Sequence, residues 1–468
     1  MEGLKKKYGL FTAICMVVGI VIGSGIFFKA PDVLKEAGYN ALYSILAWII
    51  SGVIMVIIAT TFAVMATKYE KIGGAVDYAE AMCGTGYAYY VGWFMSLIYY
   101  PAMTAVLAWV SARYTLVAVG YVEAPLGFFD GLNSSLNSPE CITLALFYLI
   151  LAYFVNTIAP GLAGKFQISS TLVKLVPIAF IALVGTVIGL VNGNLVSNLE
   201  YYTIHSSEAE QGTGLLPAIC STIFAYEGWI VATSINSEIK DSKKNLPIAL
   251  CAGTFIIMTA YTFYNLGILG FAGIGDMIKN GTVVAFRYFG GAIASVINIL
   301  IIISCLGTLN GLMLGGCRGI YSLSSRGRGF APEIFGQVDK KTNMPHNSAI
   351  FTLLMCAVWF VYFILLGSGL FSFGMISNYT FDSSELPIIT LYALYIPIII
   401  SMIIKERELN PFQRFVLPIL SLFGIGVIIY ASITKHRMGN VWYLIVFAVI
   451  MFIGFLVQKY NEKKQQNH

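Results

Sequence analysis

The chain has 468 residues, of which 58% are hydrophobic and 11% are Asp, Glu, Lys or Arg. Soluble domains average about a quarter charged residues and just under half apolar ones, so this composition excludes a soluble enzyme, a disordered scaffold and a disulfide-stapled secreted domain. The small net charge of +5 lies in the loops between apolar blocks, which favours membrane topology over a nucleic-acid partner and predicts a polytopic membrane protein.

Twelve apolar segments are long enough to cross a bilayer, which takes about 20 residues of helix. The first segment follows Lys5, Lys6 and Lys7, but its apolar stretch is longer than that of a signal peptide, so we expect it to remain in the mature protein. The sequence therefore predicts an all-α integral membrane protein with twelve transmembrane helices. They lie near residues 9–29, 41–66, 88–112, 141–158, 168–191, 214–236, 246–271, 291–316, 348–367, 373–404, 413–433 and 440–458.

The basic residues predict the orientation of these spans. With the N-terminus inside, 20 of the 28 Lys and Arg residues lie in inner segments and seven in outer segments, while Lys174 lies within a span. Lys and Arg concentrate in the cytoplasmic loops of membrane proteins. We therefore expect both termini to be cytoplasmic and the protein to be a multi-pass component of the plasma membrane.

The cysteines and histidines form no recognisable metal-binding or reactive pattern. No C-x-x-C occurs among the eight cysteines, and most of them lie in apolar blocks, where a free cysteine behaves as a small hydrophobe. The four histidines lie outside the apolar blocks and far apart in sequence. We therefore expect no metal, no cofactor and no His-dependent catalytic site.

Glycines interrupt the first predicted span near its middle. Gly19, Gly23, Ser24 and Gly25 occur there, and two glycines flanking a serine weaken a helix. If the chain unwinds, the amides of Ser24, Gly25 and Ile26 become the N-terminus of a half-helix, where unpaired N–H groups and the helix dipole favour an anion. The Gly19-x-x-x-Gly23 spacing also fits a helix-packing face, and the sequence leaves both interpretations open.

The sixth predicted span carries an acidic residue beside a glycine. Glu227 precedes Gly228 at a depth where a charge is costly unless it faces a cavity or a partner. Spans one and six are five spans apart, as in transporters built from two inverted repeats that bind substrate where broken helices meet. This spacing predicts a substrate site at the two breaks, although Glu227 also fits a structural anchor between helices.

Two further features place charge in or near spans. Lys174 lies about two turns into the fifth span, where it fits either a fixed or proton-carrying cation or a structural tether to a carboxylate or carbonyl. Asp382 and Glu385 precede Pro387 in the tenth span. If that helix begins near 386, they form an N-terminal capping box. If it begins near 373, both carboxylates lie within the membrane and suit a gate or a coupling site.

Several runs together resemble a known transporter family. They are 23–27 in span one (Gly-Ser-Gly-Ile-Phe), 224–229 in span six (Phe-Ala-Tyr-Glu-Gly-Trp), Lys174 in span five, 304–311 in span eight and 318–322 after it. With these runs, nearly the whole chain resembles the amino acid–polyamine–organocation superfamily. It is similar to bacterial serine/threonine and alanine/serine/cysteine exchangers and to L-type amino acid transporters.

The resemblance implies a LeuT-type fold with 5+5 inverted repeats. The transporter core would occupy residues 1–404, with repeats at about 9–191 and 214–404. Residues 405–468 would supply two additional, peripheral helices and a cytoplasmic tail.

The resemblance also implies roles for individual residues. The substrate α-carboxylate would meet the amides of Gly23, Ser24 and Gly25, and its α-amine would meet carbonyls at the ends of the first half-helices. Lys174 would be the coupling residue and implies transport without sodium. The remaining expected residues are Ile20, Ile26, Phe224, Ala225, Glu227 and Tyr261 for substrate binding, and Thr308, Asp382 and Glu385 for a gate or for coupling.

Departures from the family pattern bear on substrate charge and on partners. Glu227 is acidic where many relatives carry a neutral residue, and Asp382 and Glu385 are unusual in span ten, which puts a preference for neutral substrates in doubt. Cys141 lies near the outer loop where eukaryotic light chains bond a glycoprotein, but its setting at the start of span four differs. We expect no obligatory heavy-chain partner.

The leading hypothesis is a sodium-independent transporter of small L-amino acids, either exchanging or proton-coupled, that works by alternating access. An alternative with the same fold is a cationic amino acid or polyamine carrier that uses the membrane carboxylates. A hypothesis from another class is an amino acid sensor that binds without transport. The sequence shows neither the charge rings of a channel nor the nucleophile with base, or metal ligands, of a membrane enzyme.

Overall fold

The computed structural model describes residues 9–69, 74–119, 138–205, 213–280, 288, 291–342, 344–367 and 380–466. In this part of the chain, 11 helices are long and apolar enough to cross a membrane, and the bent pair α1 (Leu10–Val21) and α2 (Gly25–Glu36) makes 12 when it is counted as one span. The prediction of an all-α integral membrane protein with twelve spans is therefore confirmed.

The remaining spans follow in chain order, several of them made of two or three consecutive helices. They are α3 (Ala41–Lys68); α5 (Thr85–Phe94), η1 (Met95–Tyr99) and α6 (Tyr100–Ala118); α7 (Pro139–Ile158); α8 (Pro160–Phe180), η2 (Ile181–Gly185) and α9 (Thr186–Val191); α11 (Leu215–Tyr226) and η4 (Trp229–Glu238); α12 (Ser242–Phe271); α15 (Gly291–Cys317) and α16 (Gly319–Ser324); α18 (His346–Tyr362) and η5 (Phe363–Gly367); α19 (Leu386–Lys405); η7 (Phe412–Val416) and α20 (Leu417–His436); and α21 (Met438–Gln466). Shorter helices are α4 (Ala75–Cys83), α10 (Asn194–His205), α13 (Ile274–Asn280) and α17 (Pro332–Phe335).

Of the two starts that the sequence left open for the tenth span, the structure shows the later one. Helix α19 begins at Leu386, and Pro387 occupies its first turn, where proline is tolerated because the N–H it lacks has no intrahelical partner. Asp382 Oδ1 accepts hydrogen bonds from the backbone N–H groups of Ser384 (2.6 Å) and Glu385 (3.1 Å). Asp382 thus holds the turn that leads into α19, whereas Glu385 is the N-cap residue and no side chain caps this helix. Residues 373–379 lie outside the described ranges.

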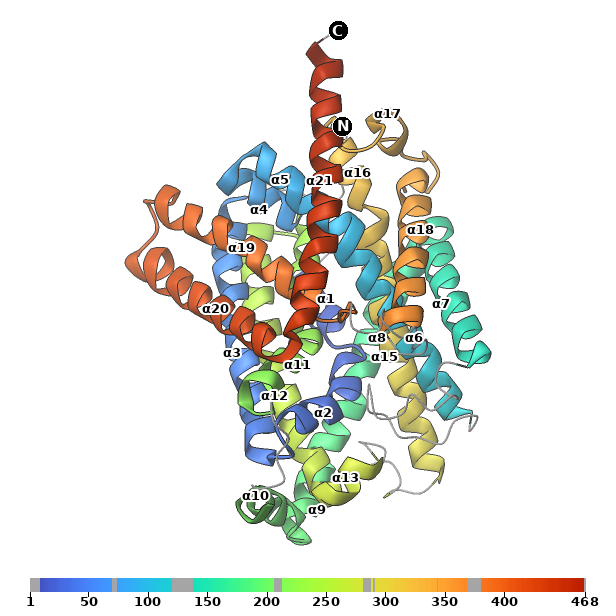
Figure 1. Cartoon of the computed structure of the whole chain (residues 1–468), viewed down its shortest axis with the longest axis vertical. Coiled ribbons are helices and arrows are strands. Elements are labelled where there is room, and N and C mark those ends of the chain that lie inside the picture. Colours follow the sequence, from blue (N-terminus) through green and yellow to red (C-terminus); the bar gives the residue numbers. More distant parts are fainter. Residues whose placement is uncertain are drawn as a thin grey trace.

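Figure 1 shows the C-terminal end of α21 at one end of the bundle and α10 and α13 at the opposite end, with α2 in the same half as α10 and α13. The broken helices α1, α2 and α11 lie in the interior, where α1 packs against α12 and α8, and α2 packs against α11. In Figure 1, α20 lies at the left side of the bundle, whereas α21 runs across its front and extends beyond its upper end. Helix α21 exposes large apolar side chains on its surface. An exposed apolar surface of this kind is stable in lipid, which fits a membrane-spanning position.

The first break separates α1 from α2 by 46°. Ile22 leaves the helical region with φ −69° and ψ 103°, and Ser24 occupies the N-cap position of the next helix without a side-chain capping bond. Gly19 packs so closely on Thr171 of α8 that a Cβ would collide with it. Both interpretations of the first-span glycines are therefore correct, since Gly19 provides packing and residues 22–24 provide the break.

The second break lies between α11 and η4, where the sequence predicts it. Glu227 is extended, with φ −84° and ψ 156°, and Gly228 has φ +111°. A positive φ of this size is costly for any residue with a side chain. A Cβ on Gly228 would also lie 3.1 Å from Ile20 Cγ2 of α1, so glycine permits both the turn and the close approach of the two broken helices.

Candidate functional site

The two breaks border a common cavity. Its lining comes from both broken helices and from the third and eighth spans. The lining residues are Ile20, Val21, Gly23, Ser24, Gly25, Tyr99, Met103, Leu107, Phe224, Glu227, Gly228, Thr308 and Leu312.

The N-terminus of α2 faces this cavity. The first N–H groups of a helix have no partner within the helix and carry the positive end of its dipole, and here they belong to residues beginning with Gly25. Two close approaches fix their position: a Cβ on Gly25 would lie 2.5 Å from Ala225 Cα, and one on Gly23 would collide with Thr308 Oγ1. The arrangement presents hydrogen-bond donors suited to a carboxylate.

Tyr261 of α12 joins the ends of α1 and α11. Its hydroxyl lies 3.3 Å from the carbonyl oxygen of Val21 and 3.1 Å from that of Ala225, and the side chain is fully buried. The last carbonyls of a helix lack intrahelical partners and carry the negative end of the dipole. Tyr261 therefore belongs to the predicted site, but as a clamp between the two helix ends and not as part of the cavity lining.

Lys174 of α8 is fully buried and reaches the end of α1. Its Nζ donates to the carbonyl oxygen of Gly19 at 2.6 Å and to Thr308 Oγ1 at 3.1 Å. Thr308 Oγ1 in turn lies 3.4 Å from the carbonyl oxygen of Ile22. The ammonium group thus contacts carbonyl and hydroxyl oxygens beside the first break. One of the two roles that the sequence left open for Lys174, a structural contact with a carbonyl, is therefore present.

Glu227 is the charged residue of the cavity lining. Its Oε1 accepts a hydrogen bond from Tyr99 Oη at 2.8 Å, while its buried Oε2 has no hydrogen-bond partner among the described residues. A buried polar atom without a partner is costly. This oxygen is consequently available to a donor that enters the cavity.

Not all expected site residues line the cavity. Ile20, Gly23, Ser24, Gly25, Phe224, Glu227 and Thr308 do so. Ile26 and Ala225 lie in the adjoining helices without being part of the lining. The sequence analysis missed Tyr99, Met103, Leu107, Leu312 and Gly228. The sequence feature that could have pointed to Tyr99 is its position directly before Tyr100-Pro101, and in the structure Tyr99 ends the π-helical turn η1.

Asp382 and Glu385 lie apart from this cavity. Asp382 holds the turn before α19, and the fully buried Glu385 contacts Lys29, Lys435 and His436. Sequence reasoning placed the last three residues in loops and assigned them no role. The acceptor atoms of Cys220, Glu385 and His436 lie within 4.8 Å of one another, as metal ligands do. Two lysine ammonium groups on the same carboxylate oppose a divalent cation there.

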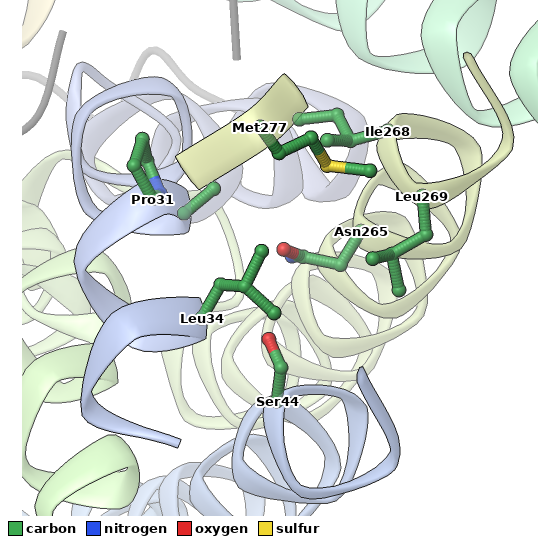
Figure 2. A pocket seen from close by; sticks show the side chains of 8 residues that line it. Pro31, Leu34, Ser44, Asn265, Ile268, Leu269 and Met277 are labelled. Carbon is green, nitrogen blue, oxygen red and sulfur yellow. The ribbon is translucent and has the colours of Figure 1, made fainter. Parts of the chain in front are cut away.

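A second pocket lies between α2, α3, α12 and α13. Figure 2 shows Pro31 and Leu34 facing Asn265 and Leu269 across it, with Met277 closing one side. Most of its lining is apolar, and Asn265 Nδ2 donates to the carbonyl oxygen of Tyr261 at 2.9 Å. Because no charged side chain lines it, this pocket is less suited to a zwitterion than the cavity at the breaks.

Comparison with known proteins identifies similar transporters. The pattern of the amino acid permease family matches residues 8–456. The chain is 26% identical over 450 residues to the serine/threonine exchanger SteT of Bacillus subtilis (strain 168), covering 94% of this chain and 93% of that protein. It is 25% identical over 349 residues to the human cystine/glutamate transporter, covering 74% and 66%. It is 27% identical over 366 residues to the human large neutral amino acids transporter small subunit 2, covering 75% and 63%.

Proposed function

The chain belongs to the amino acid permease family, and on this premise we propose that it moves small L-amino acids across the plasma membrane by alternating access, without sodium. Family membership makes it a transporter and not an enzyme. The observation that carries the proposal is one cavity bordered by the N-terminus of α2 and by the C-terminal ends of α1 and α11. Opposite helix ends around one cavity suit a molecule with both charges.

The substrate α-carboxylate binds the amides of Gly23, Ser24 and Gly25 in this proposal. The α-amine binds carbonyl oxygens near Ile20 and Phe224, which line the same cavity. Tyr261 already holds the carbonyls of Val21 and Ala225. It thereby sets the distance between the two helix ends rather than touching the substrate.

The proposed architecture is the 5+5 inverted repeat within residues 1–404, with residues 405–468 supplying two peripheral helices and a tail. The two breaks in equivalent spans support it. Cytoplasmic termini are supported by the 20 basic residues in inner segments against seven outside. In this orientation α2 and α11 lie in the outer half of the membrane.

Lys174 supplies the positive charge at the first break, and this is our reason for proposing sodium independence. Its ammonium group is held by a carbonyl and a hydroxyl oxygen, which are ligand types that a bound cation takes. Because the Lys174 side chain already occupies the position between these oxygens, no external cation is needed to hold α1 against α8 and α15. Thr308 shares the contact and is therefore part of the same coupling element.

We also propose that the carrier works without an obligatory heavy chain. Cys141 lies near the region where disulfide-linked light chains bond a glycoprotein. Its side chain is fully buried at the start of α7. A buried thiol is not accessible to a second protein. Among the mechanisms that the sequence left open, the name of the serine/threonine exchanger favours exchange over proton symport.

Uptake into liposomes tests the function. Purified protein is reconstituted, and uptake of labelled serine, alanine, arginine and putrescine is measured with and without unlabelled amino acid inside. Exchange predicts uptake that requires internal amino acid and is unchanged when potassium replaces sodium. Uptake driven by an imposed pH gradient alone would replace exchange with proton symport. Binding without flux would overturn the proposal in favour of a sensor.

Cationic amino acids are the second candidate substrates, because Glu227 Oε2 is buried and has no hydrogen-bond partner in the described part of the chain. The aromatic rings of Tyr99 and Phe224 line the same cavity, and aromatic faces attract cations. A side-chain ammonium or guanidinium group would satisfy the carboxylate. Preferential uptake of arginine or putrescine over alanine in the same liposomes would favour this candidate.

A further inference from the structure

A buried ionic cluster joins four helices in the proposed outer half of the bundle. Its centre is Glu385, just before α19, with no exposed surface. Lys29 Nζ of α2 lies 2.5 Å from Glu385 Oε1. Lys435 Nζ of α20 lies 2.9 and 2.8 Å from the two carboxylate oxygens, and His436 Nε2 lies 2.9 Å from Oε2. Cys220 Sγ of α11 completes the contacts at 3.6 Å.

The cluster connects two pairs of helices that differ in their relation to the substrate cavity. Helices α2 and α11 pack against each other and supply the ends that border the cavity, whereas α19 and α20 pack against each other outside it. The polar links between the two pairs include Lys29 with Glu385, Cys220 with Glu385 and Lys435 with Ser221 Oγ (2.6 Å), and α11 also packs against α20. An outward opening that moves α2 and α11 away must break these links.

We propose that Lys29, Glu385 and Lys435 form a charge-exchange latch that closes the outer side of the substrate cavity. In the closed state, Glu385 is shared by both lysines. In the open state, Lys29 leaves with α2, and Glu385 stays paired with Lys435 on the α19–α20 side. The latch rests on the proposed alternating access, because it is a device for one of its two states.

Lys435 is the component that makes the latch reversible. A buried carboxylate that loses its only cation is strongly destabilised. Because Lys435 contacts both oxygens of Glu385, the carboxylate remains paired after Lys29 departs. Lys29 loses a partner but moves toward the outer surface, where water can solvate it. The second lysine thus lowers the free energy of the open state, and the first lowers that of the closed state.

This division of roles predicts effects of opposite sign for two similar substitutions. Lys29→Met removes the closing contact and leaves Glu385 paired with Lys435, so the outward-open population rises. Lys435→Met removes the bond to Ser221 but leaves Lys29 as the remaining lysine partner of Glu385. Stripping a buried carboxylate of that lysine costs more than one hydrogen bond to a hydroxyl, so opening becomes costlier and the open population falls. A merely structural cluster would respond to both substitutions in the same direction.

Cys220 provides the readout, because its side chain is fully buried against Glu385 and separation of the two helix pairs would uncover it. Cells carrying the full-length protein are treated from outside with a membrane-impermeant maleimide, and modified cysteines are identified by peptide mass spectrometry. When reclosing is faster than modification, the rate follows the open population. We expect Cys220 labelling about tenfold faster in Lys29→Met and about tenfold slower in Lys435→Met, the change that about 1.4 kcal/mol produces.

Lys35→Met is the matched control, since Lys35 lies on the same helix α2 but is partly exposed and outside the cluster; its labelling should equal that of the wild type. Equal or same-direction changes in Lys29→Met and Lys435→Met would overturn the latch. Failure of the latch leaves liposome uptake intact in the wild type. If uptake fails while the opposite labelling changes persist, the latch stands as a conformational switch and the transport proposal falls.

Discussion

The two helix breaks differ in what holds them and in what they offer a ligand. At the first break, Lys174, Thr308 and Tyr261 bind carbonyl oxygens at the end of α1. The N–H groups of α2 face the cavity from the other side of the break. At the second break, Tyr261 binds the carbonyl of Ala225, and the next charged group is Glu227 with a free oxygen.

This difference assigns separate tasks to the two breaks. The first is anchored by a buried cation and presents backbone donors, which every amino acid can use through its carboxylate. The second presents a side-chain carboxylate, which only some substrates can satisfy. General recognition of an amino acid therefore resides in the first break, and discrimination among side chains in the second. Substitutions at each break should separate these tasks.

The largest effect is expected for Gly25→Leu at the first break. Even a Cβ there would lie 2.5 Å from Ala225 Cα, so a larger side chain must push α2 and α11 apart and fill the carboxylate site. Overpacking of this kind costs about 1–3 kcal/mol, and we expect apparent affinity for all amino acid substrates to fall by about 100-fold. Scintillation-proximity binding measures it.

Gly426→Leu serves as its control, because a Cβ on Gly426 of α20 meets nothing within 4 Å. That variant should bind as the wild type does. Retained affinity in a folded Gly25→Leu protein would contradict the placement of the substrate carboxylate.

Lys174→Met is expected to have the next largest effect. It removes the lysine hydrogen bond to the carbonyl of Gly19, and a hydrogen bond from a charged group contributes about 2 kcal/mol, which corresponds to about a 30-fold change in rate. We expect exchange flux to fall by about that factor while the protein still folds, as judged by size-exclusion chromatography. Lys165→Met, on an exposed position of the same helix, should be neutral. Flux unchanged from the wild type at every pH would remove Lys174 from the mechanism.

The sequence predicts local features of this fold well. Apolar run length determines the spans, and the glycines of residues 19–25 and 228 determine the breaks, because both depend on neighbours along the chain. For the tenth span the sequence left two starts open, near 373 and near 386, and α19 begins at the later one. Hydropathy alone could not choose between them, since the turn at residues 382–385 depends on backbone geometry.

Contacts between distant residues could not be predicted in this way. Lys29 and Glu385 are 356 positions apart, and Lys435 and Glu385 are 50 apart. Tyr99 reaches Glu227 across 128 positions. Each of these side chains has an ordinary local context, and it acquires its partner only when the helices pack.

Glu227→Gln tests the second break. The amide keeps the shape of the side chain and an acceptor for Tyr99 but removes the charge that Oε2 offers to the cavity. Competition by arginine or lysine should weaken by about tenfold, because hydrogen bonds to charged groups contribute about 1.5–3 kcal/mol. Competition by alanine should change by less than about twofold. Glu333→Gln, at an exposed carboxylate, is the control, and an equal loss for alanine and arginine would assign Glu227 a structural role.

Asp382→Ala should have the smallest effect, because this side chain touches neither break. It removes the acceptor for the N–H groups of Ser384 and Glu385, and loss of such hydrogen bonds costs about 1 kcal/mol of stability. We expect a small decrease in the thermal unfolding midpoint in detergent, with exchange flux close to that of the wild type. If flux is instead abolished in a folded Asp382→Ala protein, Asp382 acts in gating or coupling, and the separation of tasks would have to include the start of α19 as a third element.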